Sequence, residues 1–359
     1  MKTLADLRHF AITRSLFPPT TLSRAIETLG FVQADPIRAP ARAQDLILRP
    51  RVKGYRAGDL ERKYRRLSIE EDVFINYGFV TRGLHQLMHP RSGVSPNAAG
   101  KRAAALLAFV REKGTVHPRD VDAHFAHGRV TNYWGGSSSA TTHMLEALHY
   151  RGLLRVAGRE GGIRLYAARE PGEGASGARI RRARVDALVD VVVAKYAPVP
   201  DVSLPFIISR LRYAVPQWRG ELRNALARAR QRLSQANVER HTWYWPAGEQ
   251  PGETGAPEAA RLLAPFDPVV WDRRRFELLW EWAYRFEAYT PEPKRKLGYY
   301  ALPLLWRDLV IGWANVTFRD GVMDASLGYV AGRPPRERTF RREIDAELER
   351  FRAFLSPAG

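Results

Sequence analysis

The chain has 359 residues, of which 45% are hydrophobic and 11% aromatic, so it is long enough for about two or three compact units with apolar cores. It carries a formal net charge of +19 and contains no cysteine, which excludes disulfide bonds and thiolate metal sites. The N-terminus lacks an apolar signal core and no run of about 18 apolar residues follows, so we expect a cytoplasmic protein without a membrane segment.

The N-terminal region, residues 1–97, is predicted to form a loose winged-helix-like module. Apolar residues at helical spacing predict helices near Leu4–Ser15 and Leu22–Leu29. A short buried strand is expected next, at Phe31–Ala34.

The clearest module is predicted at residues 98–170. The expected elements are a helix at Lys101–Glu112, a helix that begins near Pro118, a helix at Ser137–Tyr150, and two strands within Leu153–Tyr166 that are joined by a Gly-rich turn. Three helices and a β-hairpin form a winged helix, which is a variant of the helix-turn-helix. Such modules bind DNA or serve as scaffolds for protein interactions.

Two Gly/Pro-rich linkers, at 170–178 and 246–257, enclose a second winged-helix-like module at residues 178–246. Its predicted elements are helices at Ile180–Tyr196, Ser203–Tyr213 and Trp218–Leu233 and a wing strand at Val238–Trp245. Residues 258–359 are expected to form a β-rich domain with strands within 284–330 and a last helix at Arg336–Leu355. The predicted fold class is mainly α with small β elements, an α+β chain of tandem winged helices.

Positive charge recurs along all of these modules, and the sequence pI is about 10.5. The basic clusters are Arg38/Arg42, Arg49/Arg51/Lys53, Arg62/Lys63/Arg65/Arg66, Arg181/Arg182/Arg184, Arg273/Arg274/Arg275 and Lys294/Arg295/Lys296. One such cluster is typical of a solvated surface, but their recurrence indicates a groove that follows a phosphate backbone. From the charge alone we therefore expect nucleic acid or another anionic surface as the partner.

Gln33 and Asp35 are the polar side chains of the short N-terminal strand. A strand has a period of two residues, so both are expected on one face, opposite Val32 and Ala34. An amide beside a carboxylate can hold and activate one water molecule, which indicates hydrolytic chemistry on a polyanion. The alternative is structural, because Asp35 before Pro36 is also typical of a helix N-cap with proline in the first turn.

No metal site is predicted from the nine histidines. His124 and His127 are three residues apart, but no acidic third ligand shares their face. The sequence also contains no P-loop and no G-x-S-x-G motif, so phosphate-loop and serine-hydrolase chemistry are not expected.

Three segments carry a resemblance to a known family. Residues 262–273 read LLAPFDPVVWDR and residues 284–303 read YRFEAYTPEPKRKLGYYALP. They resemble the LLSPFD…WDR and Y.PAPKR.YGYY.LP hallmarks of the YcaQ/AlkZ family of winged-helix DNA glycosylases, which repair interstrand crosslinks. Residues 29–37 read LGFVQADPI and resemble the LG.LQ.D.I strand of that family, with the Gln-x-Asp motif that characterises its YcaQ-like branch.

Two positions depart from the family pattern. Gly78 and Phe79 stand where the family has a His-Glu pair, and Gln44 and Asp45 stand where a His pair is frequent.

The resemblance implies tandem winged helices and hydrolysis of the N-glycosidic bond of alkylated, N7-modified purines, including the unhooking of interstrand crosslinks. It implies double-stranded DNA with alkylated or crosslinked purines as the partner, and no metal or organic cofactor. We expect a monomer with a nucleoid-associated location in the cytoplasm. In this interpretation Asp35 stabilises the oxocarbenium-like sugar and activates water, and Gln33 orients that water. Arg38 and Arg42 are expected one turn apart on the following helix. The predicted DNA-binding residues are Arg38, Arg42, Arg51, Lys53, Lys294, Arg295 and Lys296.

Two alternatives remain open at this point. The first is a non-catalytic winged-helix DNA-binding protein, either a regulator or a structural factor, which keeps the basic modules and does not need Asp35. The second is a winged-helix scaffold for protein interactions, whose affinity for DNA would be weak and would depend little on salt.

Overall fold

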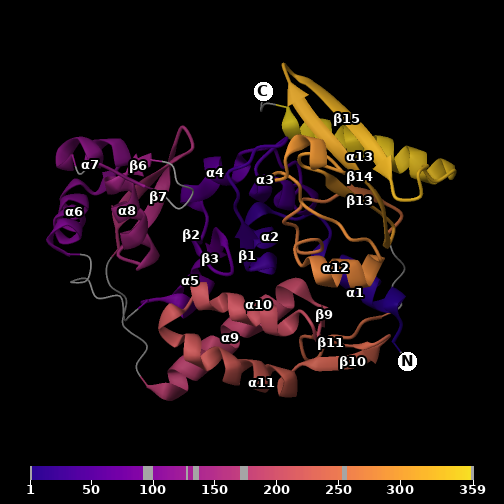
Figure 1. The fold of residues 1–359 in the computed structure, drawn as a ribbon, viewed down its shortest axis with the longest axis horizontal. Coiled ribbons are helices and arrows are strands. Elements are labelled where there is room, and N and C mark those ends of the chain that lie inside the picture. Colours follow the sequence, from indigo (N-terminus) through magenta and orange to yellow (C-terminus); the bar gives the residue numbers. More distant parts are fainter. Residues whose placement is uncertain are drawn as a thin grey trace. The chain divides into compact units, whose positions relative to one another are not determined.

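The computed structural model describes residues 2–91, 100–126, 128–131, 137–169, 177–252 and 257–356 (Figure 1). Within these ranges the chain combines helices with small antiparallel sheets and a four-stranded C-terminal sheet. The predicted α+β fold class is therefore confirmed. The predicted linkers at 170–178 and 246–257 lie partly outside the described residues.

The chain forms two compact units, and each combines segments that are far apart in the sequence. The first unit contains Met1–Leu60, Val189–Ser209 and Arg223–Gly359, and the second contains Glu61–Leu188 and Arg210–Leu222. The division into four consecutive modules stays a prediction. A winged helix is defined by its own helices and hairpin, and the two compact units do not test it. Among the described residues, no helix is both long and apolar enough to cross a membrane.

The N-terminal helices begin and end where the sequence predicts. The Thr3 side chain caps α1 (Leu4–Ser15), and α2 (Leu22–Leu29) follows. Gly30 ends α2 with a positive φ of 64°, which glycine adopts without strain. Strand β1 (Phe31–Gln33) comes directly after it, one residue shorter than predicted.

An irregular loop follows β1, and no helix begins at Asp35. The next helix is α3 (Ala43–Leu48), so Arg38 lies in the loop and Arg42 is the residue before the first turn of α3. The expectation of one helix with both arginines one turn apart is therefore wrong. Pro40 explains the difference, because proline lacks the backbone N–H and disfavours helical backbone at the preceding residue.

The second unit contains the helices and the hairpin from which the sequence predicts a winged helix. Its elements are α6 (Gly100–Lys113), β4 (Thr115–Val116), α7 (Pro118–Phe125), β5 (Arg129–Thr131), β6 (Ser137–Ser139), α8 (Ala140–Tyr150), β7 (Leu154–Glu160) and β8 (Ile163–Ala168). Strands β4, β8 and β7 form one antiparallel sheet in that order, so the predicted three helices and hairpin are confirmed. The third helix begins at Ala140 and not at Ser137, because Ser137–Ser139 pair as β6 with β5.

The remaining elements of this part of the chain include a hairpin of β2 and β3. They are α4 (Asp59–Lys63), η2 (Tyr64–Arg66), β2 (Ile69–Val73), β3 (Tyr77–Thr81), α5 (Arg82–Met88), η4 (Leu211–Tyr213) and η5 (Pro216–Glu221). Helix α4 begins in the first unit.

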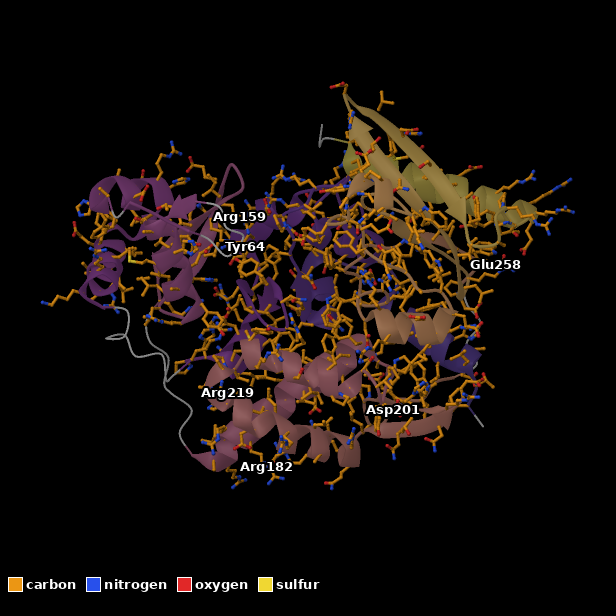
Figure 2. All side chains as sticks on the ribbon, in the orientation of Figure 1. Tyr64, Arg159, Arg182, Asp201, Arg219 and Glu258 are labelled. Atoms are coloured by element: carbon orange, nitrogen blue, oxygen red, sulfur yellow. The ribbon has the colours of Figure 1, made fainter. Side chains whose placement is uncertain are left out.

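Strand β2 contains three consecutive acids that are all buried. Each has its own arginine: Glu70 pairs with Arg169 at 2.7 Å, Glu71 with Arg159 at 2.6 Å, and Asp72 with Arg91 at 2.9 Å. The hydroxyl of Tyr64 accepts a hydrogen bond from the Glu71 backbone, and Figure 2 labels it together with Arg159. Buried carboxylates are tolerated here because each one is neutralised by its partner.

Residues 177–246 form the second set of helices with a small sheet. The elements are α9 (Ala178–Tyr196), β9 (Val199–Pro200), α10 (Leu204–Arg210), α11 (Leu222–Arg232), β10 (Ser234–Val238) and β11 (His241–Trp245). The predicted single wing strand at Val238–Trp245 is wrong, because the chain turns at Glu239, where φ is +53°. Strand β11 instead lies between β10 and β9 in one antiparallel sheet.

The C-terminal part is β-rich, as predicted, and ends in a long helix (Figure 1). Its elements are β12 (Ala260–Leu262), α12 (Arg273–Trp280), η6 (Glu292–Lys294), β13 (Leu302–Trp306), β14 (Leu309–Arg319), β15 (Val322–Tyr329) and α13 (Arg338–Leu355). The four strands pair antiparallel in chain order. The core of the first unit joins this part to α1 and β11, through residues such as Phe10, Trp243, Phe276 and Leu305.

Arg51 lies in this first unit as a core residue and not as a DNA contact. It ends the short helix η1 (Arg49–Arg51), and its side chain is fully buried. Its two terminal nitrogens donate to the Asp267 carboxylate at 2.7 and 3.0 Å. It also donates to the carbonyls of Ser15 and Ile47. Arg51 is therefore not a DNA contact, because its guanidinium is enclosed and four of its five N–H groups are bonded inside the protein.

Replacing Asp267 with asparagine tests the importance of this pair. Asp267→Asn leaves the Arg51 charge buried without its counter-charge, so the free energy of unfolding should fall by about 3–5 kcal/mol. Urea denaturation followed by tryptophan fluorescence measures the change. The matched control is Asp324→Asn on the exposed surface of β15, which should change stability by less than about 0.5 kcal/mol. Equal stability of the two variants would contradict the role given to the pair.

Candidate active site

The end of β1 places Gln33 and Asp35 in different backbone environments. Gln33 is the last residue of the strand and is 7% exposed. Asp35 lies two residues further, in the loop, and is half-buried. One of its carboxylate oxygens, Oδ1, accepts a hydrogen bond of 2.9 Å from the backbone N–H of Ile37. The position of Asp35 is thus set by an Asx turn and not by the strand period that the sequence suggested.

The second carboxylate oxygen of Asp35 is available for chemistry. Within the described part of the chain, Asp35 makes no hydrogen bond besides the one from Ile37 and no ion pair. Burial raises the pKa of Asp35, and the Ile37 N–H opposes this shift only in part. A desolvated carboxylate with one uncommitted oxygen is a stronger base than a solvated one, provided that it remains ionised.

Two tyrosines of a C-terminal loop lie within the electrostatic field of Asp35. Burial and the Asp35 charge together raise the pKa values of Tyr300 and Tyr289. Tyr300 is 4% exposed, and its hydroxyl has no hydrogen-bond partner among the residues that the structure describes. Tyr289 is 72% exposed. The tertiary fold therefore brings a loop some 250 residues further along the chain close to the N-terminal carboxylate.

Glu287 holds this loop in shape. Its buried carboxylate accepts hydrogen bonds from the backbone N–H groups of Lys296, Leu297 and Gly298 at 2.8 to 3.2 Å. Burial alone would raise the pKa of Glu287, but these three N–H groups lower it below its usual range. The carboxylate is therefore a structural anion, and it shapes the same loop that carries the predicted basic residues.

The three predicted basic residues of this loop differ in their contacts. Lys294 and Lys296 are exposed. Arg295 is half-buried, donates to the carbonyl of Thr290 at 2.8 Å, and lies 5.0 Å from the centre of the Tyr299 ring. Of the three, the two lysines have side chains in solvent and are therefore the better candidates for a phosphate contact.

A buried lysine forms a hydrogen bond to the backbone of β1. Lys195 is 8% exposed, and its Nζ donates to the carbonyl of Phe31 at 2.5 Å. Burial, with a further contribution from the nearby charge of Arg51, lowers the pKa of Lys195 to about 7. Sequence reasoning missed this residue, although a single lysine after the apolar run Val191–Ala194 is the signal that could have shown it.

The other predicted DNA-binding residues lie in three different environments: the loop after β1, a separate cavity and the core. Arg38 is exposed in the loop after Asp35, and Arg42 is half-buried next to α3. Lys53 is exposed after η1 and lines a separate cavity of the first unit, whereas Arg51 is in the core. Arg38 therefore lies in the same loop as Asp35, and Lys294–Lys296 lie between Tyr289 and Tyr300, the two tyrosines that the Asp35 charge influences, whereas Lys53 belongs to a different cavity.

One group in the second unit has the residue types of a metal site. Asp72, His85 and His89 offer ligand atoms within 4.8 Å of one another. Burial lowers the pKa of His85 to about 2, so its imidazole is neutral. The Asp72 carboxylate, however, is already bonded to the Arg91 guanidinium and to His89 at 2.6 Å. A cation would have to compete with Arg91, so we interpret this group as a buried hydrogen-bond network.

Two further sequence observations have a plain structural outcome. Gly78 and Phe79, at the positions of the family's His-Glu pair, are buried inside β3 and supply neither an imidazole nor a carboxylate. His124 lies on α7, while His127 is outside the described residues.

Comparison with known proteins agrees with the resemblance seen in the sequence. A family model described as DNA glycosylase AlkZ-like matches residues 26–354. Among solved structures, the DNA glycosylase AlkZ of Streptomyces sahachiroi is similar, with a TM-score of 0.63 and 14% sequence identity over 99% of this chain and 98% of that chain. At this identity the structural likeness shows the fold alone, whereas the family match spans most of the sequence. The chain therefore belongs to the AlkZ-like family of DNA glycosylases.

Proposed function

We propose that this protein is a monofunctional DNA glycosylase that hydrolyses the N-glycosidic bond of alkylated, N7-modified purines and unhooks interstrand crosslinks. The observation that carries the proposal is the Asp35 carboxylate, which is half-buried and has one oxygen bonded to Ile37 and the other uncommitted within the described chain. Family membership supports the reaction class.

The chemistry requires one carboxylate and one water molecule. A purine that is alkylated at N7 is cationic and leaves without being protonated by the enzyme. What remains is to stabilise an oxocarbenium-like sugar and to place a water molecule, and Asp35 performs both tasks. Gln33 orients the water through its amide, which both donates and accepts hydrogen bonds. The unpartnered hydroxyl of Tyr300 adds a polar group to the same surroundings.

DNA is held by cations of the loop that contains Asp35 and of the loop that contains Lys294–Lys296. Arg38 is exposed on the loop that contains Asp35, and Arg42 follows on that loop. Lys294 and Lys296 are exposed on the loop that Glu287 organises, and Arg295 lies between them. Contacts of this kind fix the position of the phosphate backbone and carry no sequence information.

Replacing Asp35 with asparagine is the direct test. Asp35→Asn keeps the shape and one acceptor oxygen but removes the negative charge, so the rate of base release should fall by roughly 100- to 10,000-fold. Binding to the same duplex should remain nearly unchanged. The measurement is single-turnover release of 7-methylguanine from duplex DNA, with abasic sites detected by alkaline cleavage.

The matched control is Asp345→Asn on the exposed surface of α13, which should release base at the wild-type rate. A slow Asp35→Asn variant with intact DNA binding supports the enzyme. Equal rates of base release in both variants would remove Asp35 from the mechanism. A wild-type protein that retains the damaged duplex without forming abasic sites would favour the non-catalytic DNA-binding protein.

The rate of base release should also depend on pH. Asp35 acts in its ionised form, so activity is present above its pKa and is lost as the pH falls through that value. Because burial raises this pKa, the acidic limb should lie above the ordinary aspartate value of about 3.9. Single-turnover rates over pH 4 to 8, with DNA affinity measured at each pH, locate the limb. If the residual activity of Asp35→Asn shows the same acidic limb as the wild type, the limb reports the titration of a group other than Asp35.

Salt dependence tests the proposed loop contact. If Lys294 neutralises one phosphate, Lys294→Gln should weaken binding to damaged and to undamaged duplexes by about the same factor. It should also reduce the slope of log affinity against log salt by roughly 0.9. Fluorescence anisotropy between 50 and 200 mM NaCl measures both effects. Arg342→Gln, on the exposed surface of α13, serves as the charge-matched control and should leave the slope unchanged. The same slope for Lys294→Gln and for wild type would exclude this loop from the interface.

A further inference from the structure

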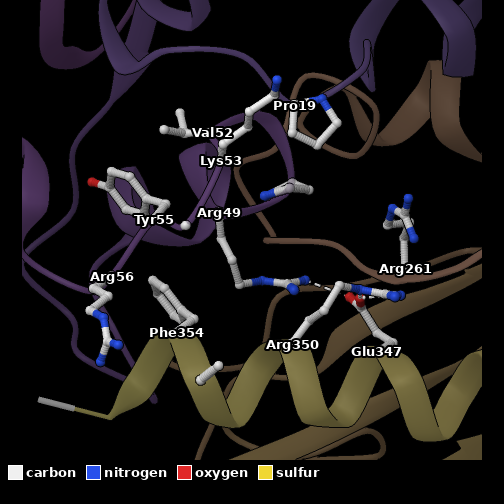
Figure 3. Close-up of a pocket in the computed structure, with 13 residues that line it drawn as sticks. Pro19, Arg49, Val52, Lys53, Tyr55, Arg56, Arg261, Glu347, Arg350 and Phe354 are labelled. Atoms are coloured by element: carbon white, nitrogen blue, oxygen red, sulfur yellow. Dashed lines mark hydrogen bonds and ion pairs between the residues drawn. The ribbon is translucent and has the colours of Figure 1, made fainter. Parts of the chain in front are cut away.

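The first unit contains a cavity of about 300 Å³ whose lining includes neither Gln33 nor Asp35 (Figure 3). It is formed by η1 and the residues after it, by Arg261 of β12, and by the last turns of α13. One wall is apolar, with the rings of Tyr55 and Phe354 stacked at 6.3 Å between their centres. A space of this size holds a small anion together with several water molecules.

The charges around this cavity do not balance. Five cationic side chains and one carboxylate line it: Arg49, Lys53, Arg56, Arg261, Arg350 and Glu347. Glu347 is fully buried, and its two oxygens accept hydrogen bonds from Arg49 at 2.5 Å, from the backbone N–H of Leu262 at 2.8 Å and from Arg350 at 3.0 Å. The carboxylate of the lining is therefore already engaged with Arg49 and Arg350, and neither Arg261 nor Lys53 forms an ion pair with a described residue.

Two of the arginines lack a partner, one an anion and the other a hydrogen-bond acceptor for one N–H group. Arg261 donates to the carbonyl of Ala260 at 3.0 Å, and it forms no ion pair with any described residue. Burial lowers the pKa of Arg261, and the charges of Arg350 and Arg49 lower it further. The carboxylates of Glu347 and Glu343 oppose this shift. Arg49 is 8% exposed, and its Nε has no hydrogen-bond partner in the described structure. A buried donor without an acceptor is unfavourable and rare in folded proteins.

We propose that this cavity is a second binding site, for a phosphate group. A phosphate supplies several acceptor oxygens and up to about two negative charges, and the planar arginine fork matches its geometry. It would meet the Arg261 guanidinium, and exposed Lys53 would meet it at the entrance. The phosphate comes either from a free nucleotide-like anion or from a DNA backbone. This site does not depend on the glycosylase reaction at Asp35.

Pyrophosphate is the probe for the site. Calorimetric titration into the full-length protein, at an ionic strength kept constant with NaCl, should show one binding site per chain with a Kd below about 1 mM. Arg261→Gln and Lys53→Gln should each weaken binding by about tenfold or more, because each removes a charge-assisted hydrogen bond. Lys53 is exposed, so its variant keeps the test valid if Arg261→Gln does not fold.

The control variant is Arg342→Gln, which removes an exposed charge of α13 outside the cavity. Weaker binding by the two cavity variants with unchanged binding by this control supports the site. Equal affinity in all variants, or no saturable binding at matched ionic strength, overturns it, because a net charge of +19 then explains the attraction.

Duplex DNA distinguishes the two sources of the phosphate. Anisotropy of an undamaged, fluorescein-labelled duplex is measured with the same variants. If the cavity variants lose affinity for the duplex relative to Arg342→Gln and pyrophosphate competes with it, the site binds the DNA backbone. If affinity for the duplex is unchanged while pyrophosphate binding is lost, the site belongs to a free phosphorylated anion.

Discussion

The first unit depends above all on the buried ion pair between Arg51 and Asp267. Both side chains are inaccessible to solvent, and the guanidinium joins three parts of the chain through Asp267, Ser15 and Ile47. Removing two ions from water is costly, and only a complete set of partners offsets that cost. The pair therefore admits one arrangement of these segments, and it fixes the region of the fold from which the candidate active site is built.

The same reasoning changes what the net charge means. Several of the cations that make the sequence basic are buried. They are Arg51, Lys195 and Arg275 in the first unit and Arg91 in the second. Arg275 donates to four backbone carbonyls. A buried arginine satisfies carbonyl groups that would otherwise lack a donor. Fewer cations therefore face solvent than the composition suggests.

The candidate site combines a positioned carboxylate with neighbouring segments that hydrogen bonds hold in place. Asp35 is held by its own backbone turn, β1 is held by Lys195, and the facing loop is held by Glu287. Each of these contacts uses a charged or polar group whose partner is backbone, so the geometry does not rely on flexible side-chain pairs. A preorganised carboxylate in partly desolvated surroundings is what stabilisation of a developing cation requires.

The sequence by itself determined the local structure and the family. Helical spacing, caps and glycine turns predicted α1, α2 and the winged helix at α6 to β8, because these elements are fixed by neighbouring residues. The hallmarks at residues 262–303 indicated the family that the comparison then showed. Only the tertiary structure decided which cations are buried, that Asp35 lies in a turn, and which distant tyrosines the Asp35 charge influences. Burial and pairing are relations between segments far apart in the chain, and no local pattern encodes them.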